Sequence, residues 1–299
     1  MTVPNGMFTL DALLPPEMAR KAENVGVSKA RLPVSKMFVL GVLAGAFIAL
    51  GAVFATTVTA GGGGMLPFGV VKLLGGVVFS LGLILVVIAG AELFTGNNLI
   101  VMAWASGKVS TAELLRNWLV VYVGNFVGSV LTAVLMFGSK QYTFGGGLIG
   151  QNALQIANAK VQLEFVQAVI LGIFCNALVC LAVWLCMSAR STVDKILAIV
   201  FPITAFVAAG FEHSIANMYF VPIGLLIKGG ADASFWQMTG LVATDFTRLT
   251  WGNFLFRNLL PVTIGNIIGG SLMVGLVYWF VYLRQDVRSV GQVDVAPGD

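Results

Sequence analysis

Three ionisable side chains lie inside long apolar stretches of the sequence, where such groups are rare: Glu92, Glu212 and His213. A charged group is costly within a lipid bilayer, so an ionisable residue there usually serves function. A histidine side chain has an unperturbed pKa of about 6.5 and exchanges a proton near neutral pH. We therefore expect His213, the single histidine of the chain, to line a pore. The alternative is a neutral histidine that bonds a nearby carbonyl.

The other polar residues of these stretches have different expected roles. A carboxylate that lined an anion pathway would repel the anion. Both glutamates are therefore expected to point away from it and to accept backbone N–H bonds from unwound turns, or to be protonated. Thr95 and Asn176 can donate hydrogen bonds to an anion without a fixed charge, although an interhelical bond would explain Asn176 equally well. The residues expected to support the site structurally are Glu92, Glu212, Asn97, Asn217, Asn125 and Asn266.

The composition indicates that the bilayer surrounds these residues. Hydrophobic residues make up 58% of the chain and charged residues 10%, and the mean hydropathy is +0.93. A soluble domain has about 25% charged residues. A helix of about 20 residues crosses a bilayer, and we predict an all-α membrane protein with six crossing segments. The apolar runs span residues 36–58, 68–105, 113–138, 162–188, 195–227 and 256–283.

The second and fifth runs are too long for one crossing, and a polar, glycine-containing interruption divides each of them. Residues 90–97 and 210–217 share the pattern G-x-E-x-x-x-x-N, and residues 116–128 and 257–269 share R-N-x-L-x-V-x-x-G-N-x-x-G. Each half has three crossings, an odd number, so the second copy must enter the membrane from the opposite side. We therefore predict two inverted three-helix repeats, with helices 2 and 5 broken in the membrane and a site between the breaks.

Basic residues predict the orientation, because cytoplasmic loops carry an excess of Lys and Arg. The side that includes the N-terminus holds Arg20, Lys21, Lys29, Arg31, Lys36, Lys108, Arg116, Arg190, Lys195, Arg284 and Arg288. The opposite side holds Lys72, Lys140, Lys160, Lys228, Arg248 and Arg257. Both termini are therefore predicted to be cytoplasmic. We expect an N-terminal segment (1–35) with an amphipathic helix at 15–30, a six-helix channel domain (36–284) and a cytoplasmic tail (285–299).

The sequence gives no sign of catalysis or of a cofactor. Three cysteines fall in one apolar run at spacings that match no metal or redox motif: Cys175, Cys180 and Cys186. One histidine supplies too few ligands for haem or a metal. The net charge of +4 arises from basic residues at segment ends and does not indicate nucleic-acid binding. We expect no cofactor, no metal and no enzyme; a membrane subunit of a redox enzyme is the remote alternative.

The motifs around the two interruptions resemble the formate/nitrite transporter family, and most closely its formate channels. The resemblance rests on G-F-E-H-S-I-A-N-M at 210–218, A-E-L-F-T-G-N at 91–97, P-V-T-I-G-N-I-I-G-G at 261–270 and L-P-P-E-M-A-R-K-A-E at 14–23. It implies an aquaporin-like bundle of six helices in a homopentamer, with a pore in each protomer. In related formate channels the N-terminal helix is proposed to close the pore at low pH. One departure is T-G-N-N at 95–98, where some relatives have T-S-T.

The resemblance also implies residue roles. His213 would be the central pore histidine, with Thr95 facing the pore, Asn176 nearby and Lys160 in the vestibule. The narrow apolar slits would be Phe79 and Phe206 on the periplasmic side, and Leu83 and Leu93 on the cytoplasmic side. The implied function is a formate channel of a bacterial cytoplasmic membrane, in contact with membrane lipid. Other small weak-acid anions (nitrite, hydrosulfide, acetate and lactate) are the alternatives.

Energetic magnitudes suggest how an anion would cross the apolar slits. Desolvating an isolated carboxylate costs tens of kcal/mol by Born estimates. Protonating a carboxylate with a pKa of about 3.5 to 4 at pH 7 costs about 4 kcal/mol. We expect at least part of the flux to cross as the neutral acid, with an imidazolium at His213 as a proton source. The contrary hypothesis keeps the anion charged and has Thr95 and Asn176 replace its water.

Overall fold

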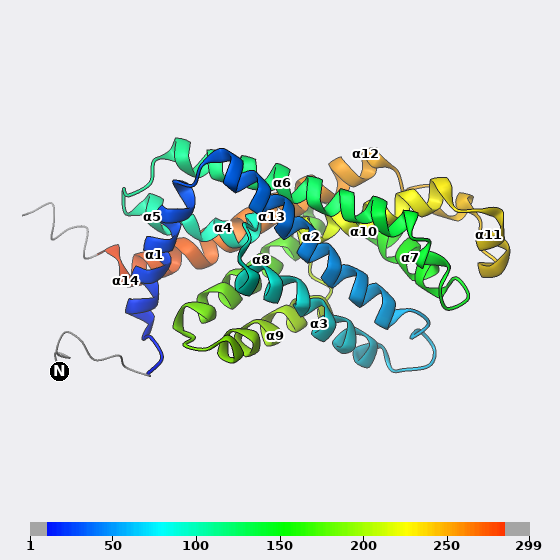
Figure 1. Cartoon of the computed structure of the whole chain (residues 1–299), viewed down its shortest axis with the longest axis horizontal. Helices are drawn as coiled ribbons and strands as arrows, with labels where there is room; N and C mark the ends of the chain where they lie inside the picture. The colour runs from blue at the N-terminus through cyan, green and yellow to red at the C-terminus, as the bar shows by residue number, and fades with distance from the viewer. Residues whose placement is uncertain (1–10, 285–299) are drawn as a thin grey trace, which may run out of the picture.

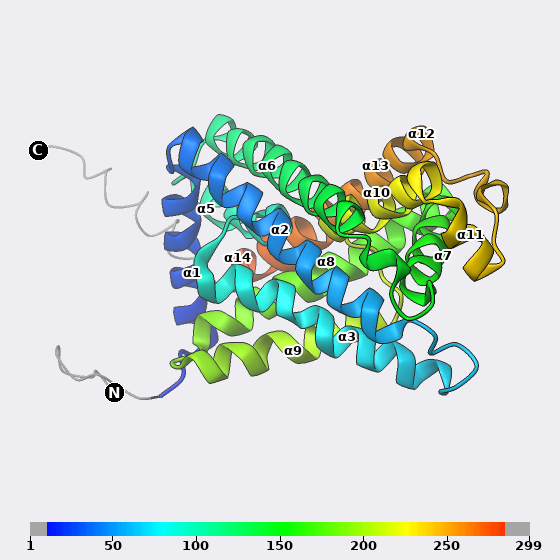
Figure 2. The ribbon, with the colours of Figure 1, turned by 45° about the vertical axis from the view of Figure 1, so that its right-hand side comes forward.

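The computed structural model describes residues 11–284, and every named secondary-structure element in that range is a helix. Residues 1–10 and the tail predicted at 285–299 lie outside the described part. The molecule is elongated: α1 and α14 lie at one end, and α7 and α11 lie at the other (Figures 1 and 2). The first and last described helices, which also contact each other, therefore share one end of the bundle.

The first half of the chain forms three long helical segments and several short ones. The helix α1 spans the predicted amphipathic segment, and one face, which includes Met18, Ala22 and Gly26, is buried against the bundle. The elements are α1 (Pro15–Ala30), α2 (Val34–Thr59), α3 (Phe68–Ile84), the π-helix η1 (Leu85–Gly90), α4 (Phe94–Asn97), the 3-10 helix η2 (Asn98–Ile100), α5 (Val101–Ala105) and α6 (Thr111–Gly138).

The second half follows a similar order of long and short segments. A 3-10 helix and an amphipathic helix connect the halves: η3 (Gln141–Thr143) and α7 (Leu148–Gln162). The elements that follow are α8 (Phe165–Ser188), α9 (Thr192–Ala208), α10 (Ser214–Gly230), α11 (Ala233–Thr239), η4 (Ala243–Phe246), α12 (Trp251–Asn253), η5 (Phe254–Leu259), α13 (Leu260–Ile267), η6 (Ile268–Leu276) and α14 (Val277–Tyr282). Of these, η4 is a 3-10 helix, and η5 and η6 are π-helices that continue α12 and α13.

Five helical segments within residues 11–284 are long and apolar enough to cross a membrane. They are Val34–Thr59, Phe68–Gly90, Thr111–Gly138, Phe165–Ser188 and Ala243–Tyr282. The predicted run at 195–227 corresponds to α9 and α10, which have 17 residues each and are separated by a non-helical turn. Many large apolar side chains on the long helices remain exposed, such as Leu119, Leu135 and Phe201. Such an exposed surface suits contact with lipid or with another protein.

Small residues let equivalent pairs of helices cross at short distance. A Cβ atom on Gly124 of α6 would lie 2.8 Å from the carbonyl oxygen of Phe38 in α2. In the second half, a Cβ on Gly172 of α8 would lie 2.8 Å from the carbonyl oxygen of Val262 in α13. These distances are too short for a side chain, so glycine is required where the backbones approach. The close crossings position the two turns described below.

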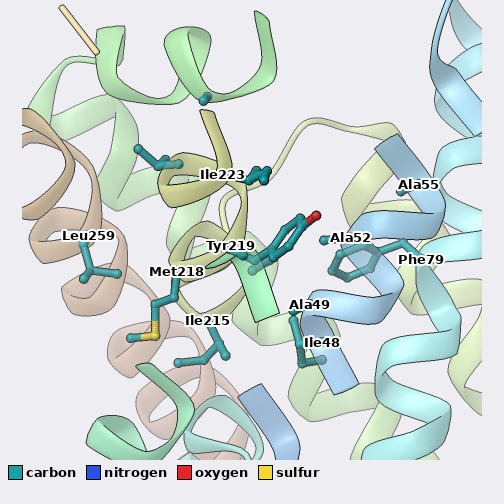
Figure 3. Packing of buried hydrophobic residues seen from close by; sticks show 14 of the residues in the cluster. Ile48, Ala49, Ala52, Ala55, Phe79, Ile215, Met218, Tyr219, Ile223 and Leu259 are labelled. Carbon is teal, nitrogen blue, oxygen red and sulfur yellow. The ribbon is translucent and has the colours of Figure 1, made fainter. Parts of the chain in front are cut away.

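Apolar side chains fill the space between α2, α3 and α10. Figure 3 shows Phe79 of α3 reaching toward Ala52 of α2, with Tyr219 of α10 directed to the same region. All three are buried, and they belong to one continuous core. This core forms the apolar wall of the candidate functional site.

Candidate functional site

The two polar interruptions form non-helical turns between successive helices. The helical segment formed by α3 and η1 ends at Gly90, with φ of 84°, and α4 begins at Phe94. After α9 the chain passes through Gly210, with φ of 74°, and α10 begins at Ser214. A positive φ suits glycine, because a Cβ atom would strain the backbone there. In each case three extended or irregular residues, the second of which is a glutamate, separate the glycine from the next helix.

Asn125 fixes the first turn through three hydrogen bonds. Its Oδ1 accepts from the Phe94 N–H at 3.0 Å, and its Nδ2 donates to the carbonyls of Gly41 at 2.8 Å and Glu92 at 2.9 Å. Leu93 is the N-cap residue of α4 and has no side-chain capping atom. Asn125 therefore supplies from α6 the acceptor that the new helix lacks.

Asn266 fixes the second turn in the same way. Its Oδ1 accepts from the Ser214 N–H at 2.9 Å, and its Nδ2 donates to the carbonyls of Gly172 at 2.8 Å and Glu212 at 3.0 Å. The N-cap of α10 is His213, the counterpart of Leu93. The two asparagines occupy equivalent positions of the repeated motif, and each makes the same three contacts with its turn.

The partners of Glu92 differ from the expectation. Its Oε1 accepts from the Lys29 ammonium at 2.7 Å and its Oε2 from the Asn97 amide at 2.7 Å. Asn117 completes the group, because its Oδ1 accepts from Asn97 at 2.9 Å and its amide donates to the Lys29 carbonyl at 3.0 Å. The prediction that backbone N–H groups satisfy this carboxylate was wrong: side chains from α1 and α4 do so.

Glu212 repeats this arrangement at the other turn. Its Oε1 accepts from Lys160 at 2.8 Å, and its Oε2 accepts from Asn217 at 2.7 Å and Asn258 at 3.2 Å. The Asn258 amide also donates to the Lys160 carbonyl at 3.0 Å. The expectation of backbone partners was wrong here too. Glu212 also lines a cavity of about 940 Å³ beside His213, so it does not point away from that space as expected.

The hydrogen bonds of His213 fix the tautomer of its neutral ring. The Ala216 N–H donates to Nδ1 at 3.0 Å, so Nδ1 presents a lone pair. The proton of the neutral imidazole is therefore on Nε2, which lies 3.0 Å from the Thr95 hydroxyl oxygen. Both side chains are buried. Nε2–H donates to Thr95, whose own hydroxyl proton is left for another acceptor.

The amide of Asn176 is occupied by the protein. Its Nδ2 lies 2.7 Å from the Asn266 carbonyl, 2.9 Å from Asn98 Oδ1 and 3.3 Å from the Thr95 carbonyl. An amide has two N–H donors, and both have partners here. Of the two roles considered for Asn176, these contacts favour the interhelical hydrogen bond.

Aromatic rings surround the histidine on one side. The Phe79 ring packs edge-on against Phe206 at 5.7 Å between centroids, and Phe206 stacks on the imidazole of His213 at 5.9 Å. Phe220 stacks on Phe79 at 6.2 Å. Leu83 and Leu93, expected at a second slit, are both buried within the same core. Of the four residues expected at the slits, Phe206 stacks on the imidazole, and Phe79 packs against Phe206.

A cavity of about 940 Å³ ends at these rings. Its walls include Phe79, Phe206, His213 and Lys160, and it continues past Lys72 to the loop between α2 and α3. Thr95, Leu83, Leu93 and Asn176 are not part of its lining. A solute that enters the cavity can therefore reach the aromatic rings and the imidazole, and the cavity does not extend beyond them.

Sequence reasoning missed several residues of the site. Asn117 and Asn258 belong to the repeated R-N pair, and this repetition was a usable signal. Asn98 and Lys29 had no comparable signal, because their partners are distant in sequence. The three cysteines are buried and unpaired. No group of three or more metal-ligating His, Cys, Asp or Glu residues occurs within residues 11–284.

Comparison with known proteins identifies the class. A family model described as formate/nitrite transporter matches residues 16–280. Formate channel FocA of Escherichia coli (strain K12) is 51% identical over 276 residues, covering 92% of this chain and 96% of that protein. FocA of Haemophilus influenzae is 41% identical over 92% of this chain and 97% of its own length. The chain belongs to the formate/nitrite transporter family, and its class is that of membrane transport proteins rather than enzymes.

Solved structures agree with this assignment. A structure described as a pentameric formate channel with formate bound has a TM-score of 0.80 and 50% identity, covering 84% of this chain and 98% of that one. A second, described as an FNT family ion channel, has a TM-score of 0.75 and 30% identity, covering 89% of this chain and 98% of that one.

Proposed function

We propose that this protein is a formate channel of a bacterial cytoplasmic membrane and that it assembles as a homopentamer with one pore in each chain. The support is its 51% identity to a formate channel and its likeness to a pentameric channel with formate bound. The observation that carries the proposal is the 940 Å³ cavity, which ends at Phe79, Phe206 and His213. Nitrite, hydrosulfide, acetate and lactate are rival substrates of the same chemical kind.

We infer that the fold is an aquaporin-like bundle of six helices formed by two inverted repeats, with the turns after Gly90 and Gly210 near the membrane midplane. The support is the equivalence of their contacts. Each turn has an asparagine with the same three bonds, and each glutamate pairs with a lysine and an asparagine five residues later. In this scheme α1 and α7, which carry the two lysines, are equivalent helices on opposite sides.

We further propose that both termini are cytoplasmic. The proximity of α1 and α14 at one end of the molecule supports a common side for the two termini (Figure 1). The excess of basic residues predicted on that side supports the cytoplasmic assignment. The cavity, at the end that holds α7, then opens to the periplasm. Residues 36–284 are the channel domain, and α1 of the N-terminal segment docks on its cytoplasmic end.

The apolar slit requires a neutral species. A charged carboxylate would lose tens of kcal/mol of hydration in such a site, whereas protonation at pH 7 costs about 4 kcal/mol. Formate therefore takes up a proton in the vestibule, HCOO⁻ + H⁺ → HCOOH, and crosses the rings of Phe79 and Phe206 as formic acid. On the cytoplasmic side Leu83 and Leu93 form the second slit, and the acid loses its proton beyond it.

His213 and Thr95 act between the slits as hydrogen-bond donors. An imidazolium would carry a proton on Nδ1 and would lose the bond from the Ala216 N–H. We therefore place the proton source in vestibule water rather than on His213, and assign to Nε2–H the task of orienting the Thr95 hydroxyl. That hydroxyl donates to the passing acid. Asn176 holds the Thr95 backbone in place, and Lys160 holds Glu212.

Uptake of labelled formate into proteoliposomes tests the proposal. We expect saturable uptake that is absent from protein-free vesicles and that unlabelled formate inhibits more strongly than nitrite, hydrosulfide or lactate. Stronger inhibition by nitrite or hydrosulfide would move the protein to another substrate within its family. Thr95→Val is expected to lower the rate about two- to tenfold, because one hydrogen bond is worth about 0.5 to 1.5 kcal/mol. A wild-type rate in this variant would contradict the donor role.

A further inference from the structure

We propose that Lys72, rather than Lys160, which the family resemblance places in the vestibule, is the side chain that concentrates the anion there. This inference rests on the proposed function, since it concerns the approach of formate to its pore. Lys72 lies on α3, is half-buried and lines the cavity. From its position alone it appeared to be one of several basic residues at a segment end.

The charge balance of the cavity carries the inference. Among the described residues that line it, the Lys, Arg, Asp and Glu side chains are Lys72, Lys160 and Glu212. Lys160 and Glu212 form an ion pair at 2.8 Å and cancel most of each other's field. Within residues 11–284 no carboxylate forms an ion pair with Lys72; its ammonium lies over the Phe68 ring at 5.4 Å from the centroid. The net fixed charge of the cavity is therefore the charge of Lys72.

Lys160 is further restricted by its neighbours. Its ammonium lies 5.4 Å from the centroid of the Phe220 ring as well as against Glu212, and its backbone carbonyl is held by Asn258. It is positioned to hold the turn that carries His213. Moving this ammonium to an anion would leave the buried carboxylate of Glu212 without its cation, which is costly.

The position of Lys72 suits long-range attraction. Phe68, Lys72, Gly75 and Phe79 recur every three or four residues along one face of α3, and all four line the cavity. With a helical rise of 1.5 Å per residue, Lys72 lies about 10 Å from Phe79 along the helix. A unit charge at about 10 Å, in a medium between protein and water, raises the local anion concentration about two- to tenfold. This attraction weakens with salt, since the Debye length is about 10 Å at 0.1 M.

Tracer exchange of formate in proteoliposomes, at ionic strengths of about 0.02 and 0.5 M set with sodium sulfate, tests the role. At low formate a passive pore has one permeability for both directions, so mixed orientation does not matter. We expect the wild-type rate to fall about two- to tenfold at high salt. Lys72→Gln is expected to show the lower rate at both ionic strengths, and Lys72→Arg to behave like wild type.

Two further variants make the test specific. Lys140→Gln removes an exposed lysine that pairs with Asp232 outside the cavity, and we expect it to keep the wild-type rate and salt response. The double variant Lys160→Gln/Glu212→Gln removes the ion pair but keeps the charge of Lys72 as the net charge of the cavity, and we expect it to transport more slowly but to retain the salt response. The inference is overturned if Lys72→Gln keeps the salt response, or if the double variant loses it. Absence of formate exchange by the wild type would instead refute the proposed function, and with it the substrate for this role.

Discussion

Replacing Asn266 by alanine is expected to disturb the turn around His213 more than the rest of the fold. This asparagine lies in α13, and its amide joins the Ser214 N–H, the Gly172 carbonyl and the Glu212 carbonyl. The side chain is fully buried. The substitution removes three hydrogen bonds at once and leaves the turn around His213 without its support.

The size of the effect follows from those three bonds. Interhelical hydrogen bonds in membrane proteins contribute about 0.6 kcal/mol each, so their loss lowers the free energy of unfolding by about 2 kcal/mol. That difference corresponds to about a thirtyfold change in the folding equilibrium constant. Formate transport is expected to fall further than stability alone explains, because the position of His213 relative to Thr95 depends on this turn.

The measurements are denaturant unfolding of the purified protein in detergent and formate uptake by the same preparation in liposomes. The matched control is Asn253→Ala. It removes an exposed hydrogen bond from the side-chain amide to the Arg248 carbonyl and is expected to change both quantities little. If Asn266→Ala unfolds and transports like Asn253→Ala, the assignment of Asn266 as the brace of the turn is incorrect.

Three further substitutions have definite expectations. Glu212→Gln leaves the partly buried Lys160 ammonium without its ion-pair partner and is expected to destabilise the fold by about 1 to 2 kcal/mol in detergent unfolding; no change would contradict a stabilising ion pair. Gly269→Ala introduces a methyl group where two helices touch and is expected to cost at least about 1 kcal/mol, whereas Gly252→Ala, in open space, is expected to be neutral in the same assay. The pKa of Lys140 is raised from 10.5 by its hydrogen bond to Asp232. The stabilisation from this bond is therefore complete below pH 10.5 and is lost as the pH rises through the higher pKa of the folded state. The difference in unfolding midpoint between wild type and Lys140→Gln should disappear there. A difference that does not change with pH would contradict this linkage.

The repeated motifs predicted the parts of the site that lie within one repeat. Asn125 and Asn266 occupy the same place in R-N-x-L-x-V-x-x-G-N-x-x-G, and each makes the same three bonds. Gly124, a glycine of the same motif, lies where α6 crosses α2 at short distance. The repetition predicts that the two asparagines have equivalent roles, whereas their bonding partners, 31 to 94 residues away, follow only from the structure.

Partners that come from other elements were not predictable in this way. Lys29 meets Glu92 across 63 residues, and Lys160 meets Glu212 across 52. Spacing along the chain contains no information about such pairs, so the glutamates were assigned to backbone donors. For the same reason Lys72 appeared as a marker of topology, and only the cavity shows that it faces the vestibule.

Uptake of labelled formate into proteoliposomes at pH 7.5 and pH 5.5 tests whether formate crosses through a pore in which His213 orients the Thr95 hydroxyl. Wild type, His213→Phe and protein-free vesicles are compared. We expect wild-type uptake to be saturable and to accelerate at the lower pH, where more of the substrate is neutral at the slit, and His213→Phe to lose most of the rate at both pH values. Wild-type uptake no faster than that of protein-free vesicles would refute the formate pore, and an unchanged rate in His213→Phe would refute the role of His213.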